Sequence, residues 1–553
     1  MAPVLTLALA QLNPTVGDLV GNIAKLRRAR AEAAKQNADL LVTAELYLCG
    51  YPPEDLVLKP SFQHDVRAAI DALAKDTADG GPALLLGTPW HEEGKLFNAA
   101  VLLDKGKIVQ RVLKKDLPNY GPFDEKRIFT SFTGKAAPLM FQGHALGVMI
   151  CEDMWTPPMA SALKKNGADI LLVINGSPFD KEKRTARETL AHERVNETGL
   201  PLLYLNQVGG QDELVFDGAS FSIASPQAAP LKLPPWEESM GLVCLEGKTL
   251  SHTTMQTLEA RPPEAALYAA LVMGLRDYVT KNGFLGVVLG LSGGIDSAVA
   301  AALAVDALGK DHVWSITMPS PYTAQTSLDD ATALAHILGC RFDTIPIHAA
   351  MTTFDSALAP VLGHPVEGIT KENIQARSRG LLLMALSNTT GFMVLSTGNK
   401  SELSVGYATL YGDMCGGFSV LKDVYKTDVY KIARWRNAHT LAWFKGPQGV
   451  LFSESLLTKA PSAELRPNQT DQDSLPAYDI LDGILTCLIE KDEGIEEIKA
   501  KGYNEKTIEW VWRLLDGAEY KRRQAPPGVK ITSRNLSRDR RYPITNKYRP
   551  EKG

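Results

Sequence analysis

GVVLGLSGGIDSAVAAALAV, residues 286–305, decides the fold of the second half of the chain. An apolar run ends at the glycine pair Gly293 and Gly294, and an alanine-rich segment with helical composition follows. This order predicts a buried strand, a tight turn and a helix, the unit from which doubly wound parallel α/β sheets are built. Glycines let backbone N–H groups approach an oxygen anion, and the positive end of the helix dipole favours one. The stretch therefore predicts a loop that holds phosphate.

The type of phosphate loop follows from its last residues. A Walker A loop needs a lysine before the final serine, but here Asp296 precedes Ser297, so that type is excluded. An aspartate among phosphates requires a divalent cation between them, so Asp296 predicts Mg²⁺. The segment SGGIDS resembles the PP-loop of the N-type ATP pyrophosphatases, which implies that ATP is cleaved between its α and β phosphates. By this resemblance the ATP-binding residues are Gly290, Leu291, Ser292, Gly293, Gly294, Ile295, Asp296 and Ser297.

Further strand and helix patterns alternate around this loop and place a domain boundary before it. Later strand-like runs are HVWSITMP (312–319), FDTIPI (342–347) and FMVLSTGN (392–399), with helical patterns over 324–338 and from about 371. Prolines 262 and 263 can open a helix over 264–281. We therefore expect domains over 1–260 and 261–553. Residues 225–262, which contain a proline-rich stretch, are predicted to be an irregular linker region.

The first half also alternates apolar strands with helices, which predicts an α/β sandwich. Its clearest strand-like runs are LTLALAQL (5–12), DLLVTAEL (39–46), ALGVMIC (145–151) and DILLVING (169–176).

Three stretches of this half carry chemically suggestive residues next to apolar or turn-rich segments. Cys151 ends a strand, Glu45 follows one, and Lys114 and Lys115 precede the turn-rich LPNYGP. Taken singly, a buried cysteine is a small hydrophobe and the charged residues are surface groups. Together they resemble the nitrilase, or carbon–nitrogen hydrolase, superfamily over residues 1–260. That resemblance implies an α-β-β-α sandwich, selects Lys114 over Lys115, and makes Cys151 the nucleophile, Glu45 the base and Lys114 the oxyanion stabiliser.

The substrate of this cysteine is expected to be glutamine. Within the superfamily, LPNY followed by FDE looks like the branch that is fused to NAD synthetase. The resemblance implies that Tyr120, Ser177 and Lys183 hold glutamine. From the residues alone, Ser177 also fits a turn and Lys183 a solvated surface.

A second signature follows the PP-loop. The stretch LSTGNKSELSVGYATLYGDMCGGFSVLKDVYKT (395–427) resembles that of NAD synthetases. The resemblance implies ATP contacts from Thr397 and Lys426, and a role for Glu402 at the metal or the dinucleotide substrate. Deamido-NAD is then expected to contact Asn373, Glu402 and Lys521, and Mg²⁺ to contact Asp296 and Glu402. Glu402 and Lys426 also fit a plain helix-surface pair. Leu410 departs from the family pattern, in which a lysine precedes the aromatic–Gly–Asp turn.

Composition limits the class of protein. The 553 residues carry a formal net charge of -4, which gives no global reason for nucleic-acid or membrane binding. The six cysteines form no CxxC pair, so we expect a reducing, cytoplasmic location without disulfides or a zinc site.

The tail from Lys521 holds eleven basic and two acidic residues, interrupted by prolines and aromatics. This pattern predicts an ordered wrap rather than a solvated tail.

Both halves together resemble the glutamine-dependent NAD synthetase family. This implies a carbon–nitrogen ligase that releases ammonia from glutamine, adenylates deamido-NAD with ATP and Mg²⁺, and amidates the adenylate, the last step of NAD biosynthesis. The family also implies a homo-oligomer. The alternatives are another PP-loop amidotransferase, such as the GMP or asparagine synthetase classes, and an ammonia-fed synthetase whose first domain is a scaffold. The set Glu45, Lys114 and Cys151 argues against the amidotransferase alternative.

Overall fold

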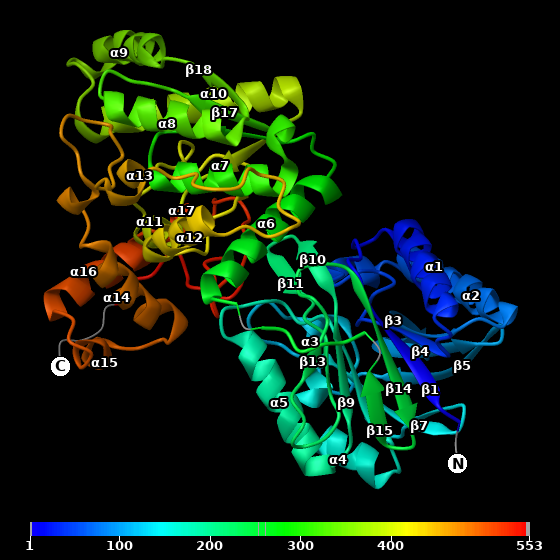
Figure 1. Ribbon diagram of the computed structural model, residues 1–553. Coiled ribbons are helices and arrows are strands. Elements are labelled where there is room, and N and C mark those ends of the chain that lie inside the picture. The colour runs from blue at the N-terminus through cyan, green and yellow to red at the C-terminus, as the bar shows by residue number, and fades with distance from the viewer. Residues whose placement is uncertain (1–2, 253, 260, 549–553) are drawn as a thin grey trace. The chain divides into compact units, whose positions relative to one another are not determined.

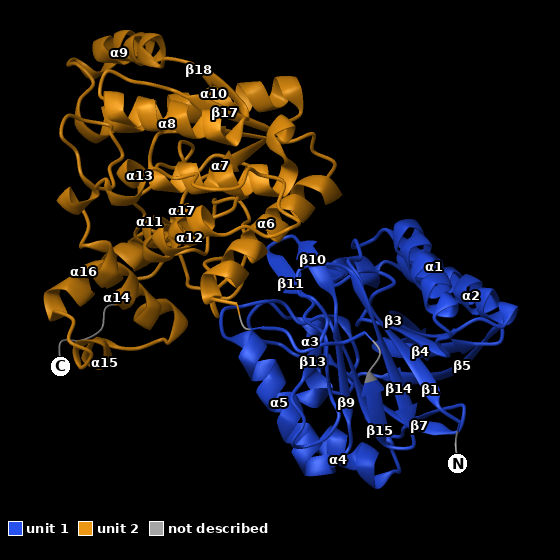
Figure 2. Ribbon diagram, in the orientation of Figure 1, with its two compact units in different colours: residues 1–260 blue, residues 261–553 orange. Residues whose placement is uncertain are grey.

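The computed structural model describes residues 3–252, 254–259 and 261–548. The chain divides into two compact units, Met1–Ala260 and Arg261–Gly553 (Figure 2). Each unit combines helices with sheets that contain parallel strands, so the α/β class predicted for both halves is confirmed. Among the described helices, none has both the length and the apolar character that a membrane span requires.

Strands form the centre of the first unit. They are β1 (Leu5–Gln11), β2 (Leu40–Thr43), β3 (Ala83–Glu92), β4 (Lys95–Asp104), β5 (Lys107–Leu113), β6 (Leu139–Phe141), β7 (His144–Ile150), β8 (Ile170–Asn175), β9 (Leu202–Asn206), β10 (Val208–Gln211), β11 (Leu214–Asp217), β12 (Phe221–Ile223), β13 (Leu231–Lys232), β14 (Ser239–Glu246) and β15 (Thr249–His252). One sheet has the order β15-β14-β1-β2-β3-β4-β5, and a second has the order β13-β12-β9-β8-β7-β6. Strands β10 and β11 pair separately.

The two large sheets pack face to face, with helices on their outer faces. Leu7 of β1 lies in one apolar core with Val148 of β7, whereas Ala8, the next residue of β1, packs in the cluster that contains Leu26. This alternation follows from the two-residue period of a strand. The outer helices are α1 (Leu19–Lys35) and α2 (Pro60–Asp76) on the first sheet, and α4 (Pro157–Lys165) and α5 (Lys183–Thr198) on the second. The unit is thus an α-β-β-α sandwich.

The prediction that residues 225–262 form an irregular linker is wrong, because β13, β14 and β15 lie within this range. Strand β14 pairs with β1 in antiparallel register, from Leu5 opposite Leu245 to Gln11 opposite Ser239. The proline-rich segment before it suggested irregular structure, but those prolines precede the strand. Residues 239–246 become a strand because β1, more than two hundred positions earlier in the chain, supplies the hydrogen-bond partner.

The second unit contains a parallel sheet. Its strands are β16 (Val287–Gly290), β17 (Val313–Thr317), β18 (Arg341–Thr344), β19 (Met393–Ser396) and β20 (Phe418–Ser419), in the order β18-β17-β16-β19-β20. Every pair in this order is parallel. The strand order reverses at β16, which continues through the glycine loop into a helix. In doubly wound sheets, ligands bind outside the carboxyl ends of the strands at this switch point.

Helices surround that sheet and continue beyond it (Figure 1). They are α6 (Pro263–Lys281), α7 (Ile295–Leu308), α8 (Gln325–Leu338), α9 (His348–Leu362), α10 (Gly368–Thr390), α11 (Lys400–Val405), α12 (Lys426–Ala438), α13 (Glu454–Thr458), α14 (Tyr478–Glu490), α15 (Ile495–Lys499), α16 (Glu505–Gly517) and α17 (Glu519–Arg522). The helices predicted over 264–281 and 324–338 are confirmed to within a residue at each end. The long helix expected from about 371 begins three residues earlier.

The described part of the basic C-terminal tail, residues 521–548, is tied to the rest of its unit by hydrogen bonds. The buried carboxylate of Asp423 accepts hydrogen bonds from the backbone amides of Ile531 and Thr532, each at 2.7 Å. Arg540 donates to the carboxylate of Glu519 at 2.9 Å. The predicted ordered wrap is therefore confirmed over the described residues of the tail.

Candidate active sites

The ends of three strands place the predicted triad of the first unit. Glu45 follows β2 by two residues, while Lys114 directly follows β5 and Cys151 directly follows β7. The side chains of Glu45 and Lys114 are fully buried, and Cys151 is 4% exposed. The Cys151 thiol interacts electrostatically with both Glu45 and Lys114. The fold thus brings the three residues together, whereas Lys115 is exposed.

Three donors converge on the carboxylate of Glu45. The ammonium of Lys114 donates to its Oε1 at 2.7 Å and the amide of Asn98 to the same oxygen at 2.8 Å. The backbone N–H of Gly176 donates to Oε2 at 2.8 Å. These contacts fix the carboxylate in one orientation, which is what a group that accepts a proton at a defined point requires.

A second buried carboxylate, Glu125, completes the surroundings of Lys114. It is the first residue of α3 (Glu125–Ile128). Its carboxylate accepts a hydrogen bond from the Lys114 ammonium at 2.7 Å and another from the Tyr51 hydroxyl at 3.0 Å. Burial raises the pKa of Glu125 to about 7, although the charge of Lys114 opposes the rise. Burial by itself lowers the pKa of Lys114, but Glu125 and Glu45 raise it well above its ordinary value. Lys114 is therefore a fixed cation, suited to stabilising an oxyanion.

Cys151 begins a one-turn 3₁₀ helix, η3 (Cys151–Met154), with a backbone φ of 48°. This left-handed conformation is costly for a residue with a Cβ and is typical of functional turns. Burial raises the pKa of the Cys151 thiol well above its ordinary value, Glu45 adds to the rise and Lys114 opposes it. The resting thiol thus keeps its proton, and an attack by sulfur needs a base beside it.

Asp153 ties the cysteine turn to the segment that follows Lys114. Its buried carboxylate accepts from the backbone amides of Ile150 at 3.0 Å, Lys115 at 3.0 Å and Asp116 at 2.8 Å. One side chain therefore sets the spacing between the end of β7 and the end of β5. No sequence pattern marks Asp153, Glu125 or Asn98 as functional, although Glu125 is the last residue of the FDE segment.

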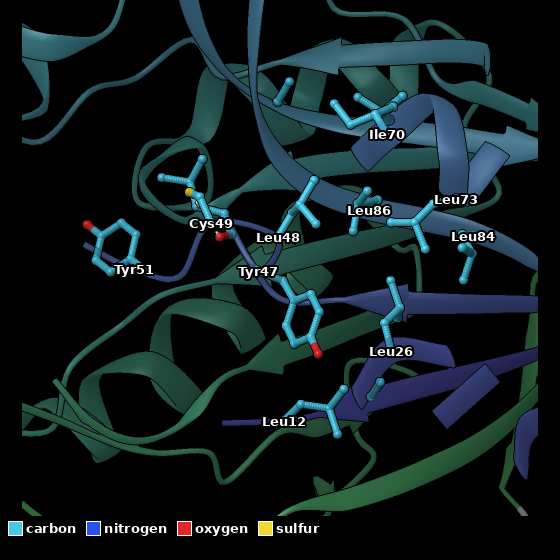
Figure 3. Packing of buried hydrophobic residues seen from close by; sticks show 14 of the residues in the cluster. Leu12, Leu26, Tyr47, Leu48, Cys49, Tyr51, Ile70, Leu73, Leu84 and Leu86 are labelled. Carbon is cyan, nitrogen blue, oxygen red and sulfur yellow. Dashed lines mark hydrogen bonds between the residues drawn. The ribbon is translucent and has the colours of Figure 1, made fainter. Parts of the chain in front are cut away.

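The segment after Glu45 is held by apolar packing. Figure 3 shows Tyr47, Leu48, Cys49 and Tyr51 within one buried cluster of this unit. The Tyr47 hydroxyl also donates to the backbone carbonyl of Asn22 at 2.9 Å. The packing fixes the chain on the carboxyl side of Glu45, so the position of that carboxylate does not depend on its hydrogen bonds alone.

Two of the three predicted glutamine-binding residues lie together. The rings of Tyr120 and Phe123 pack with their centroids 5.6 Å apart. The Lys183 ammonium lies 5.0 Å from the centre of the Phe123 ring. The Tyr120 hydroxyl donates to the carboxylate of Glu152 at 3.0 Å. Glu152 was not among the residues predicted from the sequence. Ser177 is buried, and its hydroxyl accepts from Arg187 at 3.1 Å.

The glycine loop of the second unit shows different constraints at its two central residues. Gly293 has a φ of 79°, and a Cβ there would meet the Ser327 carbonyl oxygen at 2.0 Å. At Gly294 a Cβ would come no closer than 3.4 Å to the Ser292 hydroxyl. The fold itself therefore requires glycine at 293 but not at 294. At 294 the missing side chain leaves the backbone open to a ligand.

We expect Gly294→Ala to weaken nucleotide binding by about tenfold while leaving the unfolding temperature unchanged, because the added methyl group blocks approach to the backbone. Gly293→Ala serves as the contrasting variant and should lower the unfolding temperature, because its backbone is strained and its Cβ clashes. Calorimetric titration with ATP and thermal unfolding separate the two effects. Equal losses of stability in both variants would contradict this interpretation.

A cavity of about 290 Å³ opens beside this loop. The predicted residues that line it are Gly290, Leu291, Ser292, Gly293, Gly294, Ile295, Asp296, Ser297, Thr397, Glu402 and Lys426. Lining residues that the sequence analysis missed include Arg379, Asp413, Asp471 and the segment 459–465. Asp413 is the acidic residue of the quoted Gly–Asp turn, whereas the last segment carries no pattern that we recognised.

Asp296, Glu402 and Lys426 form one charged cluster in this cavity. The Lys426 ammonium pairs with Asp296 and, at 3.1 Å, with Glu402. Burial by itself lowers the pKa of Lys426, but the two carboxylates raise it above its ordinary value. Burial raises the pKa of Glu402 to about 7, although Lys426 opposes the rise. Lys426 is buried, Asp296 and Glu402 are only partly exposed, and the three residues come from separate segments, so a plain helix-surface pair does not describe the cluster.

The donor set of this cluster fits a magnesium ion that arrives with a nucleotide. Mg²⁺ takes oxygen ligands and is commonly held by one or two carboxylates together with substrate phosphates. Asp296 and Glu402 supply two such carboxylates beside the loop. Among the described residues, no group of three or more His, Cys, Asp or Glu side chains could hold a metal ion, so this pair of carboxylates offers fewer ligands than Mg²⁺ takes.

The remaining predicted residues do not line the cavity. The Asn373 side-chain oxygen accepts from the Thr409 hydroxyl at 3.0 Å. Lys521 donates to the backbone carbonyls of Gly406 at 2.8 Å and Ala408 at 2.7 Å. These contacts hold Lys521 against the segment that leads into the Gly–Asp turn.

The family pattern has a lysine at the position of Leu410. In this chain a cation from another helix, the guanidinium of Arg377, lies beside Leu410. Arg377 of α10 donates through Nε to the Leu410 carbonyl at 3.2 Å.

Comparison with known proteins matches both units. A carbon–nitrogen hydrolase family model matches residues 6–246, and an NAD synthase family model matches residues 267–525. The glutamine-dependent NAD(+) synthetase of Rhodobacter capsulatus is 47% identical and that of Acinetobacter baylyi 44% identical, with 99% of each chain covered. The solved glutamine-dependent NAD+ synthetase of Acinetobacter baumannii, in complex with ADP, is 41% identical with a TM-score of 0.78, covering 98% of this chain and 99% of that one.

Proposed function

Because the chain belongs to the glutamine-dependent NAD(+) synthetase family, we propose that it transfers the amide nitrogen of glutamine to deamido-NAD at the expense of ATP. Its carbon–nitrogen hydrolase half is the glutaminase domain and its NAD synthase half the synthetase domain. We assign these to residues 1–260 and 261–553, the two compact units. The observation that carries the proposal is the presence of a buried cysteine–lysine–glutamate site and a phosphate-loop cavity in one chain.

In the glutaminase domain, Cys151 attacks the amide carbon of glutamine while Glu45 removes the thiol proton. Lys114, fixed between Glu45 and Glu125, stabilises the oxyanion. The intermediate collapses to a thioester as Glu45 returns the proton to the departing nitrogen, which leaves as ammonia. Glu45 then takes a proton from water, whose oxygen attacks the thioester carbon, and returns that proton to the departing sulfur of Cys151, so that glutamate and the free thiol are formed.

We propose that the polar residues around Phe123 select the substrate. Tyr120 and Lys183 pack on Phe123, and Glu152 lies beside Tyr120. A carboxylate facing Lys183 and an ammonium group facing Glu152 suit the two charged ends of an amino acid. Ser177 contributes through the loop that follows Gly176, whose amide also holds Glu45. We therefore propose that Tyr120, Ser177 and Lys183 bind glutamine.

In the synthetase domain, the loop residues 290–297 and Thr397 bind ATP, and Lys426 contacts its phosphates. The carboxylate of deamido-NAD attacks the α-phosphorus, and pyrophosphate leaves from the loop. Ammonia then attacks the acyl adenylate and displaces AMP. Glu402 lines this cavity, and Asn373 lies on α10, which contributes other residues to its wall. We propose that these two residues and Lys521 bind deamido-NAD.

We propose that Asp296 and Glu402 hold Mg²⁺. A bound Mg²⁺ would neutralise phosphate charge and orient the pyrophosphate for departure. The residues themselves supply hard oxygen donors at the loop, and Lys426 balances their charge in the free protein.

We also propose that the chain forms a homo-oligomer. Large apolar side chains are exposed on α9 and at the start of α10, namely Phe354, Val361, Leu362 and Ile369. Exposed apolar clusters of this kind are typical of association surfaces. Sedimentation of the purified chain tests this, and a monomer at all concentrations would contradict it.

All six cysteines are free thiols, which supports a reducing, cytoplasmic location.

The direct test of the proposal is incubation with ATP, Mg²⁺, glutamine and deamido-NAD. We expect one AMP and one pyrophosphate for each NAD formed, because adenylation cleaves ATP between its α and β phosphates. Chromatographic separation of the nucleotides measures AMP and NAD, and an enzymatic assay measures pyrophosphate. Formation of ADP in place of AMP would overturn the adenylation mechanism.

A further inference from the structure

Asn399 connects the segments that carry Asp296 and Glu402, two of the carboxylates that line the synthetase cavity. It follows β19 and immediately precedes α11. Its side-chain nitrogen donates to Asp296 Oδ1 at 3.0 Å, and its side-chain oxygen accepts from the backbone N–H of Glu402 at 3.0 Å. The side chain is fully buried. One amide group therefore links the aspartate of the glycine loop to the helix that carries the glutamate.

The backbone around Asn399 is anchored on both sides of the cluster. The amide of Lys400 donates to the Val424 carbonyl at 2.9 Å. The hydroxyl of Ser401 accepts from the backbone N–H of Lys426 at 2.9 Å. The segment that carries Asn399 is thus tied directly to the segment that carries Lys426, and its side chain has one defined position.

We propose that Asn399 is a positioning residue for adenylation, which holds Asp296 in the orientation that faces Glu402 and the phosphates. This inference rests on the proposed function. Asp296 has two contacts that restrain it, one from Asn399 and one from Lys426. When Lys426 turns to the ATP phosphates, the neutral amide of Asn399 remains as the restraint. An amide donor also adds no charge that would compete with a metal ion.

The competing explanation is that Asn399 only caps α11. Asparagine and serine are both favoured at the N-cap, and a serine hydroxyl can accept from the same backbone N–H. Serine is shorter than asparagine and lacks the side-chain amide N–H, so it cannot restore the contact with Asp296. The variant Asn399→Ser therefore keeps the cap and removes the restraint, whereas Asn399→Ala removes both.

The matched control is Asn504→Ser. Asn504 caps α16 by accepting from the Thr507 backbone N–H at 3.3 Å. It makes the same kind of cap without a contact to the synthetase cavity. Comparison of the two serine variants isolates the contact that Asn399 makes with Asp296.

The experiment measures three quantities on each full-length variant: the unfolding temperature, Mn²⁺ binding by electron paramagnetic resonance with α,β-methylene-ATP, and steady-state kinetics with ammonia. For Asn399→Ser we expect Mn²⁺ binding about tenfold weaker and a similar fall in kcat/KM for ATP, because a lost partner of a metal ligand typically costs that much. Its unfolding temperature should fall less than that of Asn399→Ala, because the helix cap is retained. Asn399→Ala should show the same loss of Mn²⁺ binding and a lower unfolding temperature.

Wild-type Mn²⁺ binding and kinetics in Asn399→Ser would overturn the inference and leave Asn399 as a helix cap. Should that variant fold poorly, Asn399→Asp keeps the shape and the cap but replaces the donor with a like charge, and unchanged kinetics there would also overturn it. If the wild-type chain forms neither AMP nor NAD, the proposed function fails instead, so the two failures are distinguishable.

Discussion

Replacing Cys151 with alanine is expected to lower glutamine-driven NAD synthesis by at least about 10⁴-fold, because loss of the nucleophile removes the covalent route entirely. Synthesis driven by added ammonium salt should persist, since the PP-loop cavity lies in the other compact unit. Removing the thiol exchanges a small buried side chain for a smaller one, so little stability is lost. Parallel assays with glutamine and with ammonium chloride measure the two rates.

The control variant is Cys244→Ala. Cys244 lies on β14 of the same unit and contacts Thr6 at 3.7 Å. Both of its rates should equal those of the wild-type chain. Unchanged glutamine-driven synthesis in Cys151→Ala would show that the first unit is a scaffold and that the chain uses free ammonia. Equal loss of both rates would show that the variant acts through the fold.

The second large effect is expected from Asp296→Asn, which should lower NAD synthesis by at least about 10²-fold with either nitrogen source. The substitution preserves shape but removes the negative charge beside the glycine loop, where electrostatic stabilisation of phosphate transfer is expected. It also removes one of the two acidic partners of Lys426. Unlike the loss at Cys151, this loss should not be rescued by ammonium. Rates of AMP formation measure it.

Asp329→Asn provides the comparison for this variant. Asp329 lies on α8 of the same unit, where its carboxylate accepts from Gln325 at 2.9 Å on an exposed surface. We expect its rates to be unchanged, because an exposed charge of this kind contributes little to stability. An Asp296→Asn enzyme that keeps its activity with ammonium would refute the assignment of Asp296 to the metal and the phosphates.

Apolar periodicity was sufficient to predict most of the strands that hold the two sites. Buried strands such as β7 and β16 are continuous apolar runs, and the groups that follow them, Cys151 and the glycine loop, are visible in the sequence. Strand β14 was missed because its partner β1 lies more than two hundred positions away. A segment next to prolines shows its strand character only when that partner is present.

The supporting groups of the sites could not be predicted for the same reason. Asn98 and the Gly176 amide reach Glu45 across 53 and 131 positions, and no local pattern marks such a contact. Asn399 is an exception in part, because it stands in the quoted stretch, but its contact with Asp296 spans 103 positions. Motifs therefore locate reacting groups, whereas the fold determines what orients them.

The reaction with glutamine labelled by ¹⁵N at its amide tests most directly whether the two sites act in series. Mass spectrometry of the product, in buffer that contains no added ammonium, reports the source of the carboxamide nitrogen. We predict NAD with ¹⁵N in its carboxamide and one labelled NAD for each AMP. Unlabelled NAD, or labelled ammonium released without any labelled NAD, would contradict the account.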